Sequence, residues 1–195
     1  MNAIHSLQRS PLSPVSVFSV VLCLLVLFGV TGCSPDKPAL GKSALSLRDG
    51  LQETLNLFSA GLAEPISKRD KKRVKAALDT LASKAAAPAN IPVSIAVLDT
   101  KGATVATAAR TELSATQNYG HYHAVAQAAQ KKKVILSSLY LQSGDMIFIV
   151  CAPLLYRQKL AGILIIGIDD ELLHQSGVTD AEFLSLSLAP RPGTP

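Results

Sequence analysis

Two neighbouring stretches decide the fold of this chain, DMIFIVCAPLLY at residues 145–156 and LAGILIIGID at residues 160–169. β-branched residues dominate both stretches, which favours pleated strands over helices. Each stretch is also too short to cross a bilayer as a helix. The polar segment Arg157-Gln158-Lys159 separates them. We therefore predict two paired strands joined by a tight turn.

The first of these strands is apolar on both of its sides. Side chains alternate between the two sides of a strand. One side carries Met146, Phe148 and Val150, and the other carries Ile147, Ile149 and Cys151. A strand of this kind needs a cover on both faces. We expect helices to form one cover and a lid over a cavity to form the other.

The length and charge of the chain narrow its class. At 195 residues, one folded domain with a processed leader is expected. The net charge of +5 is local, because residues 68–75 carry six basic side chains and one acidic side chain. Such a run can contact nucleic acid or anionic lipid, or it can form a solvated helix face. The solvated face is the more common case, so we predict no nucleic-acid partner.

Residues 1–32 have the features of an export signal, with an apolar segment at residues 15–30 followed by small residues. The segment ends in Val30-Thr31-Gly32-Cys33, which resembles the lipobox of bacterial lipoproteins. This resemblance implies cleavage before Cys33, a lipid on its thiol, and a membrane-bound protein that faces the periplasm or the exterior. In a Gram-negative cell, Ser34 after the cysteine would imply the outer membrane. An uncleaved membrane anchor with an incidental cysteine is the less favoured alternative.

The three cysteines have different surroundings. Cys23 lies inside the apolar leader, Cys33 ends it, and Cys151 lies in a predicted strand. After processing, only Cys33 remains as a partner for Cys151, and the lipid would occupy its thiol. We therefore expect no disulfide.

Two helices are predicted before the sheet. A polar tether at residues 33–42 leads to a helix whose apolar side chains recur every three or four residues. This stripe comprises Leu47, Leu51, Leu55, Phe58 and Leu62. Gly61 and Pro65 are expected to end the helix, and a second helix is expected to follow from about Ser67. The stripe can pack on the sheet, or it can pair with a second copy of the chain to form a homodimer.

Three further strands are expected, at residues 91–99, 103–109 and 134–141. Gly102 suits the tight turn after the first of them, because glycine adopts positive φ without strain. An antiparallel sheet with helices packed on it, which is an α+β fold, accommodates this order of elements.

The second and third of these strands are linked by a crossover at residues 111–133, with a helix at about residues 122–132. We place the folded domain at residues 43–188. The tail at residues 189–195 is rich in proline and is expected to be disordered.

Residues 97–105 (VLDTKGATV), 152–155 (APLL) and 160–169 then resemble the single Cache type of extracytoplasmic sensor domain, which has a PAS-like fold. The resemblance covers about residues 43–175. It implies a five-stranded antiparallel sheet in the order 2-1-5-4-3. It also implies a small-molecule pocket between the sheet and the crossover.

The crossover is the most informative polar stretch. Its aromatic and hydrogen-bonding side chains are those of a small-ligand site. The residues that we assign to such a site are Arg110, Tyr119, Tyr122 and His123 from the crossover, with Tyr140 and Cys151 from the sheet. Arg110 can hold a carboxylate through both of its terminal nitrogens. Each of these side chains can instead serve only the core.

Catalytic and metal-binding motifs are not apparent. His121 and His123 can both face a metal from an extended segment, but no third ligand lies near them in the sequence. The chain also lacks a Walker loop, a GxSxG motif, an HExxH motif and paired carboxylates. We therefore predict no metal site, no cofactor and no enzymatic activity.

The favoured function is that of a lipid-anchored, extracytoplasmic module that binds a small metabolite, such as an organic acid or an amino acid. It would serve as a sensor or accessory to a separate signalling or transport protein. The alternative is an envelope scaffold with no small ligand, which dimerises through its N-terminal helices.

The substitution Cys33→Ala is expected to abolish lipid labelling and cleavage of the leader, because the lipobox chemistry requires the thiol. Metabolic labelling with a radioactive fatty acid and the mobility of the chain on a gel check this result. Normal maturation and membrane retention of the variant would contradict the lipobox interpretation.

Overall fold

A computed structural model describes residues 39–85, 91–108, 118–141 and 144–190. The chain divides into two compact units, Met1–Lys37 and Pro38–Pro195. The first unit, with the predicted leader and Cys33, lies outside the described residues. Both hydrophobic cores formed by the described residues lie in the second unit, as is typical of a domain with its own core.

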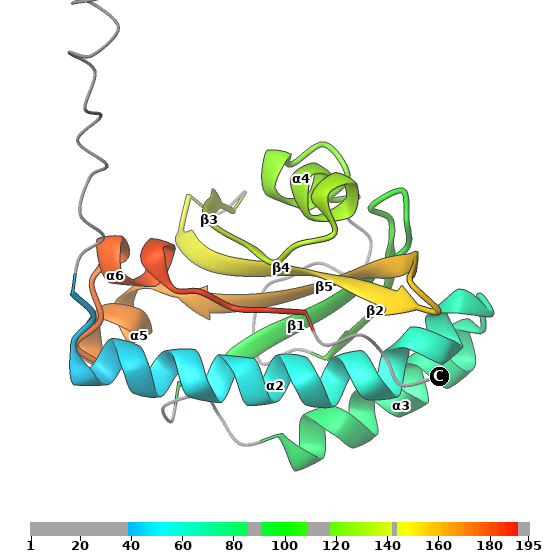
Figure 1. The fold of residues 1–195 in the computed structure, drawn as a ribbon, viewed down its shortest axis with the longest axis horizontal. Helices are drawn as coiled ribbons and strands as arrows, with labels where there is room; N and C mark the ends of the chain where they lie inside the picture. Colours follow the sequence, from blue (N-terminus) through cyan, green and yellow to red (C-terminus); the bar gives the residue numbers. More distant parts are fainter. Residues whose placement is uncertain (1–38, 86–90, 109–117, 142–143, 191–195) are drawn as a thin grey trace, which may run out of the picture. The chain divides into compact units, whose positions relative to one another are not determined.

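The second unit is built on one antiparallel sheet of five strands (Figure 1). The strands are β1 (Val93–Leu98), β2 (Thr104–Ala108), β3 (Ile135–Tyr140), β4 (Met146–Tyr156) and β5 (Lys159–Asp169). Their order across the sheet is β2-β1-β5-β4-β3. The predicted α+β fold class and strand order are therefore confirmed.

Strands β4 and β5 form the centre of the sheet and its longest pairing, from Ile147 opposite Asp169 to Tyr156 opposite Lys159. The turn between them is one residue shorter than predicted. Arg157 and Gln158 alone form it, with φ angles of 48° and 63°. Two left-handed residues match the twist of the strands that they join, so Lys159 already belongs to β5.

Helices α2 (Lys42–Ser67) and α3 (Lys71–Lys84) cover one face of the sheet (Figure 1). The predicted stripe of α2 packs there against side chains such as Phe148 and Val150 of β4. Each of the five stripe residues is fully buried within the chain. The stripe is therefore core and does not provide a surface for pairing with a second copy.

Helix α2 is longer than predicted, because neither Gly61 nor Pro65 ends it. A side chain at Gly61 would place its Cβ 2.7 Å from Cδ1 of Leu81 in α3. Glycine is thus present to let the two helices approach closely. Pro65 lies in the last turn of α2, where its ring is buried. Packing of α2 against α3 and the sheet therefore outweighs the two local helix-breaking signals.

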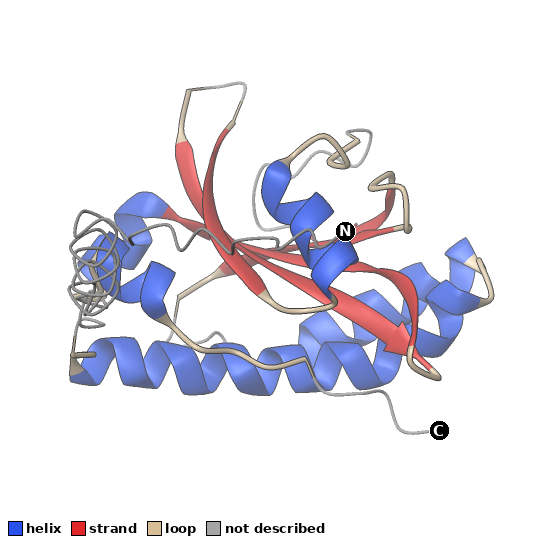
Figure 2. Cartoon of the chain, turned by 45° about the horizontal axis from the view of Figure 1, so that its top comes forward, coloured by secondary structure: helices blue, strands red, loops and turns tan. Residues whose placement is uncertain are grey.

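Helix α4 (His123–Lys131) covers the other face of the sheet, as Figure 2 shows from a second direction. Ala124, Val125 and Ala128 of α4 pack in a second core with Ile149 and Cys151 of β4. The two faces of β4 thus enter two different cores, as the alternation of its side chains predicted.

Two short helices follow the sheet, α5 (Asp170–Gln175) and α6 (Asp180–Ser185). Thr179 and Glu182 form a capping box at the start of α6. Glu182 also accepts a hydrogen bond from the backbone N–H of Gly41 at 2.8 Å, which ties α6 to the start of α2.

The ordered chain extends beyond the predicted boundary at residue 188. The side chain of Gln52 in α2 donates to the carbonyl of Ala189 at 2.9 Å and accepts from its N–H at 3.0 Å. These two bonds hold Ala189 against α2, and residues 191–195 of the predicted tail lie outside the described residues. None of the described helices combines the length and the apolar character that a membrane span requires.

The substitution Leu55→Ala is expected to lower the free energy of unfolding by about 2–5 kcal/mol, because it leaves a cavity between α2 and the sheet. Urea denaturation of the Pro38–Pro195 unit measures this loss. Leu45→Ala is the matched control, since Leu45 is 37% exposed on the same helix. The control should change the same quantity by no more than about 0.5 kcal/mol. Equal effects of the two substitutions would contradict the assignment of the buried face.

Candidate functional site

The turn between β1 and β2 holds the end of the crossover in place. Asp99 organises this turn, because its Oδ1 accepts hydrogen bonds from the backbone N–H groups of Lys101 at 2.8 Å and Ala103 at 2.9 Å. Gly102 has a φ of 83°, and a side chain there would clash with the backbone of Gly120. The N–H of Tyr119 donates to the carbonyl of Gly102 at 2.8 Å. Close glycine contacts thus fix where Tyr119 enters the core.

Aromatic side chains cover the sheet at this point. Tyr119 is only 1% exposed, and its ring centroid lies 5.8 Å from that of Tyr122. The ring of His121 lies 4.1 Å from Tyr122 on the outer side, tilted by 35°. We call Tyr119, His121 and Tyr122 the aromatic cover. Together with α4, it forms the second layer over the sheet that the sequence predicted.

Cys151 lies in the floor beneath this layer. It is a free cysteine and is completely buried, among aliphatic side chains of β4 and β5 such as Ile149 and Ile165. Burial raises the pKa of its thiol to about 12. The thiol therefore stays protonated near neutral pH and contributes apolar surface rather than a nucleophile.

The structure brings together only part of the predicted site. Tyr119, Tyr122 and Cys151 belong to the same core. His123 is exposed at the start of α4, where its ring lies beside the side chain of Gln127. Arg110 lies outside the described residues.

Tyr140 lies away from the other predicted site residues. It pairs with Met146, whereas Cys151 pairs with Ile135. These register positions place Tyr140 and Cys151 on opposite faces of the sheet. The Tyr140 side chain is also 69% exposed. The structure therefore does not join Tyr140 to the aromatic cover.

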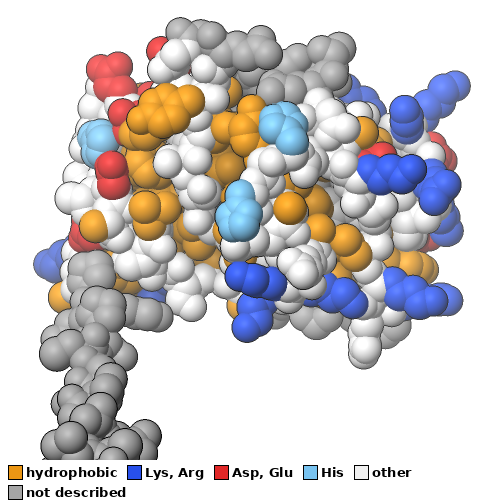
Figure 3. Space-filling model, turned by 90° about the horizontal axis from the view of Figure 1, so that it is seen from above, with side chains coloured by type: hydrophobic (Ala, Val, Ile, Leu, Met, Phe, Trp, Pro, Cys, Tyr) orange, Lys and Arg blue, Asp and Glu red, His pale blue; other side chains and the backbone are white. Residues whose placement is uncertain are grey.

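The surface over α4 has a mixed character (Figure 3). Apolar side chains lie beside histidine side chains in the middle of this face, and Lys and Arg side chains gather at one end of it. A patch that combines apolar and hydrogen-bonding groups suits a ligand with both kinds of surface.

A pocket of about 540 Å³ lies elsewhere, at the end of the domain where β4 turns into β5. The C-terminal end of α2, the start of α3, the β1–β2 turn and the β4–β5 hairpin enclose it. We call it the hairpin pocket. The sequence predicted the basic run at residues 68–75 but not its place beside this pocket.

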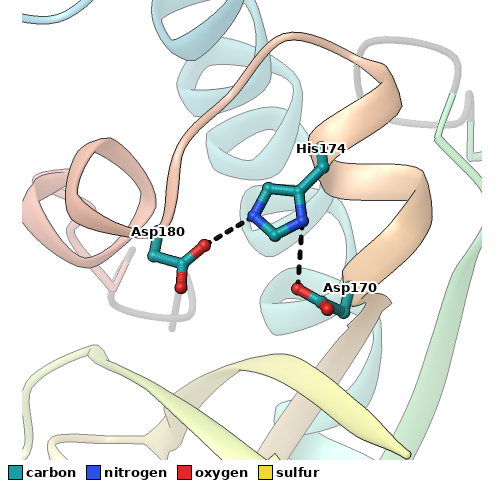
Figure 4. Close-up of side chains that lie close together, drawn as sticks. All are labelled: Asp170, His174 and Asp180. Carbon is teal, nitrogen blue, oxygen red and sulfur yellow. Dashed lines mark hydrogen bonds and ion pairs between the residues drawn. The ribbon is translucent and has the colours of Figure 1, made fainter.

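A histidine that the sequence analysis did not assign to a site links α5 to α6 (Figure 4). The ring of His174 lies between two carboxylates, with Nε2 2.6 Å from Asp180 and Nδ1 3.3 Å from Asp170. Asp180 lies on the next helix, so only the tertiary structure reveals this arrangement. The spacing of Asp170 and His174 along one helix was its only sequence signal.

The cluster of Asp170, His174 and Asp180 offers metal-ligand atoms within 4.8 Å of one another. Each ring nitrogen, however, faces a different carboxylate (Figure 4). This arrangement suits a protonated imidazole, which donates a hydrogen bond to Asp180 and forms an ion pair with Asp170, better than a neutral ring that binds a cation. Neither His121 nor His123 belongs to such a group among the described parts of the chain.

No protein-family profile and no curated protein matches the chain. Solved structures match it at low sequence identity. One is the ligand-binding domain of the Pseudomonas aeruginosa PAO1 amino acid chemoreceptor PctC in complex with GABA. It is 15% identical with a TM-score of 0.50, and the match covers 69% of this chain and 62% of that one.

A second match is the sensor domain of the V. cholerae histidine kinase DctB. It is also 15% identical with a TM-score of 0.50, and the match covers 70% of this chain and 54% of that one. The chain thus spans less than two thirds of either structure. The likeness shows that the α+β fold is that of Cache and PAS-like sensor domains, as the sequence resemblance implied.

The contribution of His174 to the stability of the Pro38–Pro195 unit is expected to fall as the pH rises above about 6.5, because the unfolded chain then loses the imidazole proton before the folded chain does. The hydrogen bond to Asp180, aided by the charge of Asp170, holds the pKa of His174 above its ordinary value. A group whose pKa is raised on folding stabilises the fold fully below its ordinary pKa. That contribution disappears as the pH rises through the raised pKa.

The difference in urea midpoint between the native chain and His174→Gln measures this effect over pH 5–9. We expect the difference to be largest at the acidic end and to shrink as the pH rises. His123→Gln is the control, because His123 forms no ion pair with a carboxylate among the described residues. A difference that does not depend on pH would refute the charged link.

Proposed function

We propose that this chain is a lipid-anchored, extracytoplasmic sensor or accessory domain that binds a small metabolite on the α4 face of its sheet. The observation that best supports this proposal is the aromatic cover. Its residues Tyr119 and Tyr122 lie over an apolar floor that includes Cys151. Aromatic walls over an apolar floor, with polar groups at the edge, are typical of small-ligand sites.

The proposed ligand carries a carboxylate, as in an amino acid or an organic acid. Arg110 is the proposed carboxylate partner, because a guanidinium group binds a carboxylate through two parallel hydrogen bonds. His123 at the exposed start of α4 is the proposed second polar contact. A similar fold in an amino acid chemoreceptor supports this ligand class. We leave Tyr140 out of the site, since it lies on the opposite face.

The proposed activity is binding rather than catalysis. The protonated thiol of Cys151 is a poor nucleophile, and the His174 cluster lies in α5 and α6 rather than under the aromatic cover. The proposed signal passes to a separate signalling or transport protein of the envelope. The lipobox at Cys33 supports the proposed anchoring and an extracytoplasmic position.

Thermal unfolding of the Pro38–Pro195 unit with a library of amino acids and organic acids tests this proposal. A ligand at about 100 times its dissociation constant adds about 2.7 kcal/mol to the stability of the native state. That increase corresponds to a rise in melting temperature of roughly 5–10 °C for a domain of this size. We expect Arg110→Ala and Tyr122→Ala each to weaken binding by about tenfold or more.

Tyr140→Ala is the matched control, because it removes the same side chain from the other face of the sheet. It should leave the affinity unchanged. The proposal fails if no ligand in the library stabilises the unit saturably. It also fails if Tyr122→Ala binds the ligand as tightly as Tyr140→Ala does.

A further inference from the structure

The hairpin pocket lies on the face of the sheet opposite the aromatic cover. Its floor is aliphatic and is formed by Ile66, Val74, Val105, Leu160 and Ala161. Ile66 and Val74 belong to the core of the α2–α3 face, and Val105 and Ala161 pack against that core. The pocket therefore continues the hydrophobic core outward to solvent.

Cations from the α2–α3 junction, the β1–β2 turn and the β4–β5 hairpin form the rim of this pocket. Arg69 comes from the turn after α2, Lys71 from the start of α3, and Lys101 from the β1–β2 turn; Arg157 and Lys159 come from the β4–β5 hairpin. None of these five side chains lies within ion-pairing distance of a carboxylate among the described residues. Mutual repulsion of unpaired cations is unfavourable, and a bound anion would relieve it.

The nearby carboxylates are engaged elsewhere. Asp99 lines the pocket, but its Oδ1 accepts the backbone hydrogen bonds of the β1–β2 turn. Asp70 caps α3 by accepting from the N–H of Arg73 at 3.0 Å. Glu64 pairs with Lys68. The five rim cations therefore outnumber Asp99, the carboxylate among the lining residues.

One of the rim cations is already positioned. The guanidinium carbon of Arg157 lies 5.4 Å from the centre of the Tyr156 ring, within the range of a cation–π contact. Tyr156 itself lines the pocket. A side chain held in this way loses less conformational freedom when it binds a ligand, which favours affinity.

We propose that the hairpin pocket binds a small aliphatic anion, with its carboxylate at the cationic rim and its hydrocarbon chain on the floor. The volume of about 540 Å³ falls within the range of small-ligand pockets. A guanidinium group binds a carboxylate through two hydrogen bonds, and the aliphatic floor gains from covering a hydrocarbon chain. This site is additional to the proposed metabolite site and does not depend on it.

Isothermal titration calorimetry of the Pro38–Pro195 unit with octanoate tests the proposal. Acetate carries the charge without the chain, and octylamine carries the chain with the opposite charge. We expect saturable binding of octanoate, binding of acetate weaker by about tenfold or more, and no binding of octylamine. Amide chemical-shift changes in an NMR titration should map to residues 66–74, 99–105 and 156–161.

The double variant Lys71→Gln/Lys101→Gln should bind octanoate about tenfold or more weakly, because it removes two charged partners from the rim. The matched control is Lys42→Gln/Lys84→Gln, which changes the charge equally at two exposed helical positions outside the pocket. It should bind octanoate with unchanged affinity. Ala161→Leu places a larger side chain on the floor, so it should weaken the binding of octanoate more than the binding of acetate.

Four results would overturn this proposal: no saturable binding of octanoate; acetate or octylamine binding as tightly as octanoate; equal affinity in the two double variants; or shift changes confined to residues 119–128. The last result would place the anion at the aromatic cover and would support the proposed function instead. Conversely, the loss of metabolite binding in Tyr122→Ala does not change the binding of octanoate that we expect at the hairpin pocket. The two proposals therefore fail separately.

Discussion

The pairing of β4 with β5 is the constraint on which the rest of the domain depends. Both strands are apolar on both sides, so neither face of the sheet is stable against water. The chain therefore supplies one layer from its N-terminal helices and another from the crossover. Among the described residues, the aromatic cover lies on the second of these layers, and the hairpin pocket lies where the first layer meets the end of the sheet.

The two ends of the domain differ in chemistry. At one end, the start of α2 is tied to α6 through Gly41 and Glu182, and His174 links α5 to α6 between two carboxylates. At the other end, basic side chains from three segments surround the hairpin pocket. A charge difference of this kind orients the approach of charged ligands and partners to the domain.

Sequence reasoning found part of the candidate site because its signals are local. Tyr119 and Tyr122 are close in sequence, and the alternation along β4 places Cys151 on the same side as Ile149. The structure places Tyr140 on the opposite face from Cys151, and this placement depends on the register between β3 and β4. A shift of one residue in register moves a side chain to the opposite face, and no local pattern reports that shift.

By itself, the sequence determined the α+β class, the positions of the strands and the need for two covers, because these follow from periodicity and side-chain type over short stretches. Only the tertiary structure decided that α2 continues through Gly61 and Pro65, that Asp180 meets His174, and that five cations converge on one pocket. These features join residues that are distant in sequence. Their energies come from packing and electrostatics across elements, which no single stretch of the chain contains.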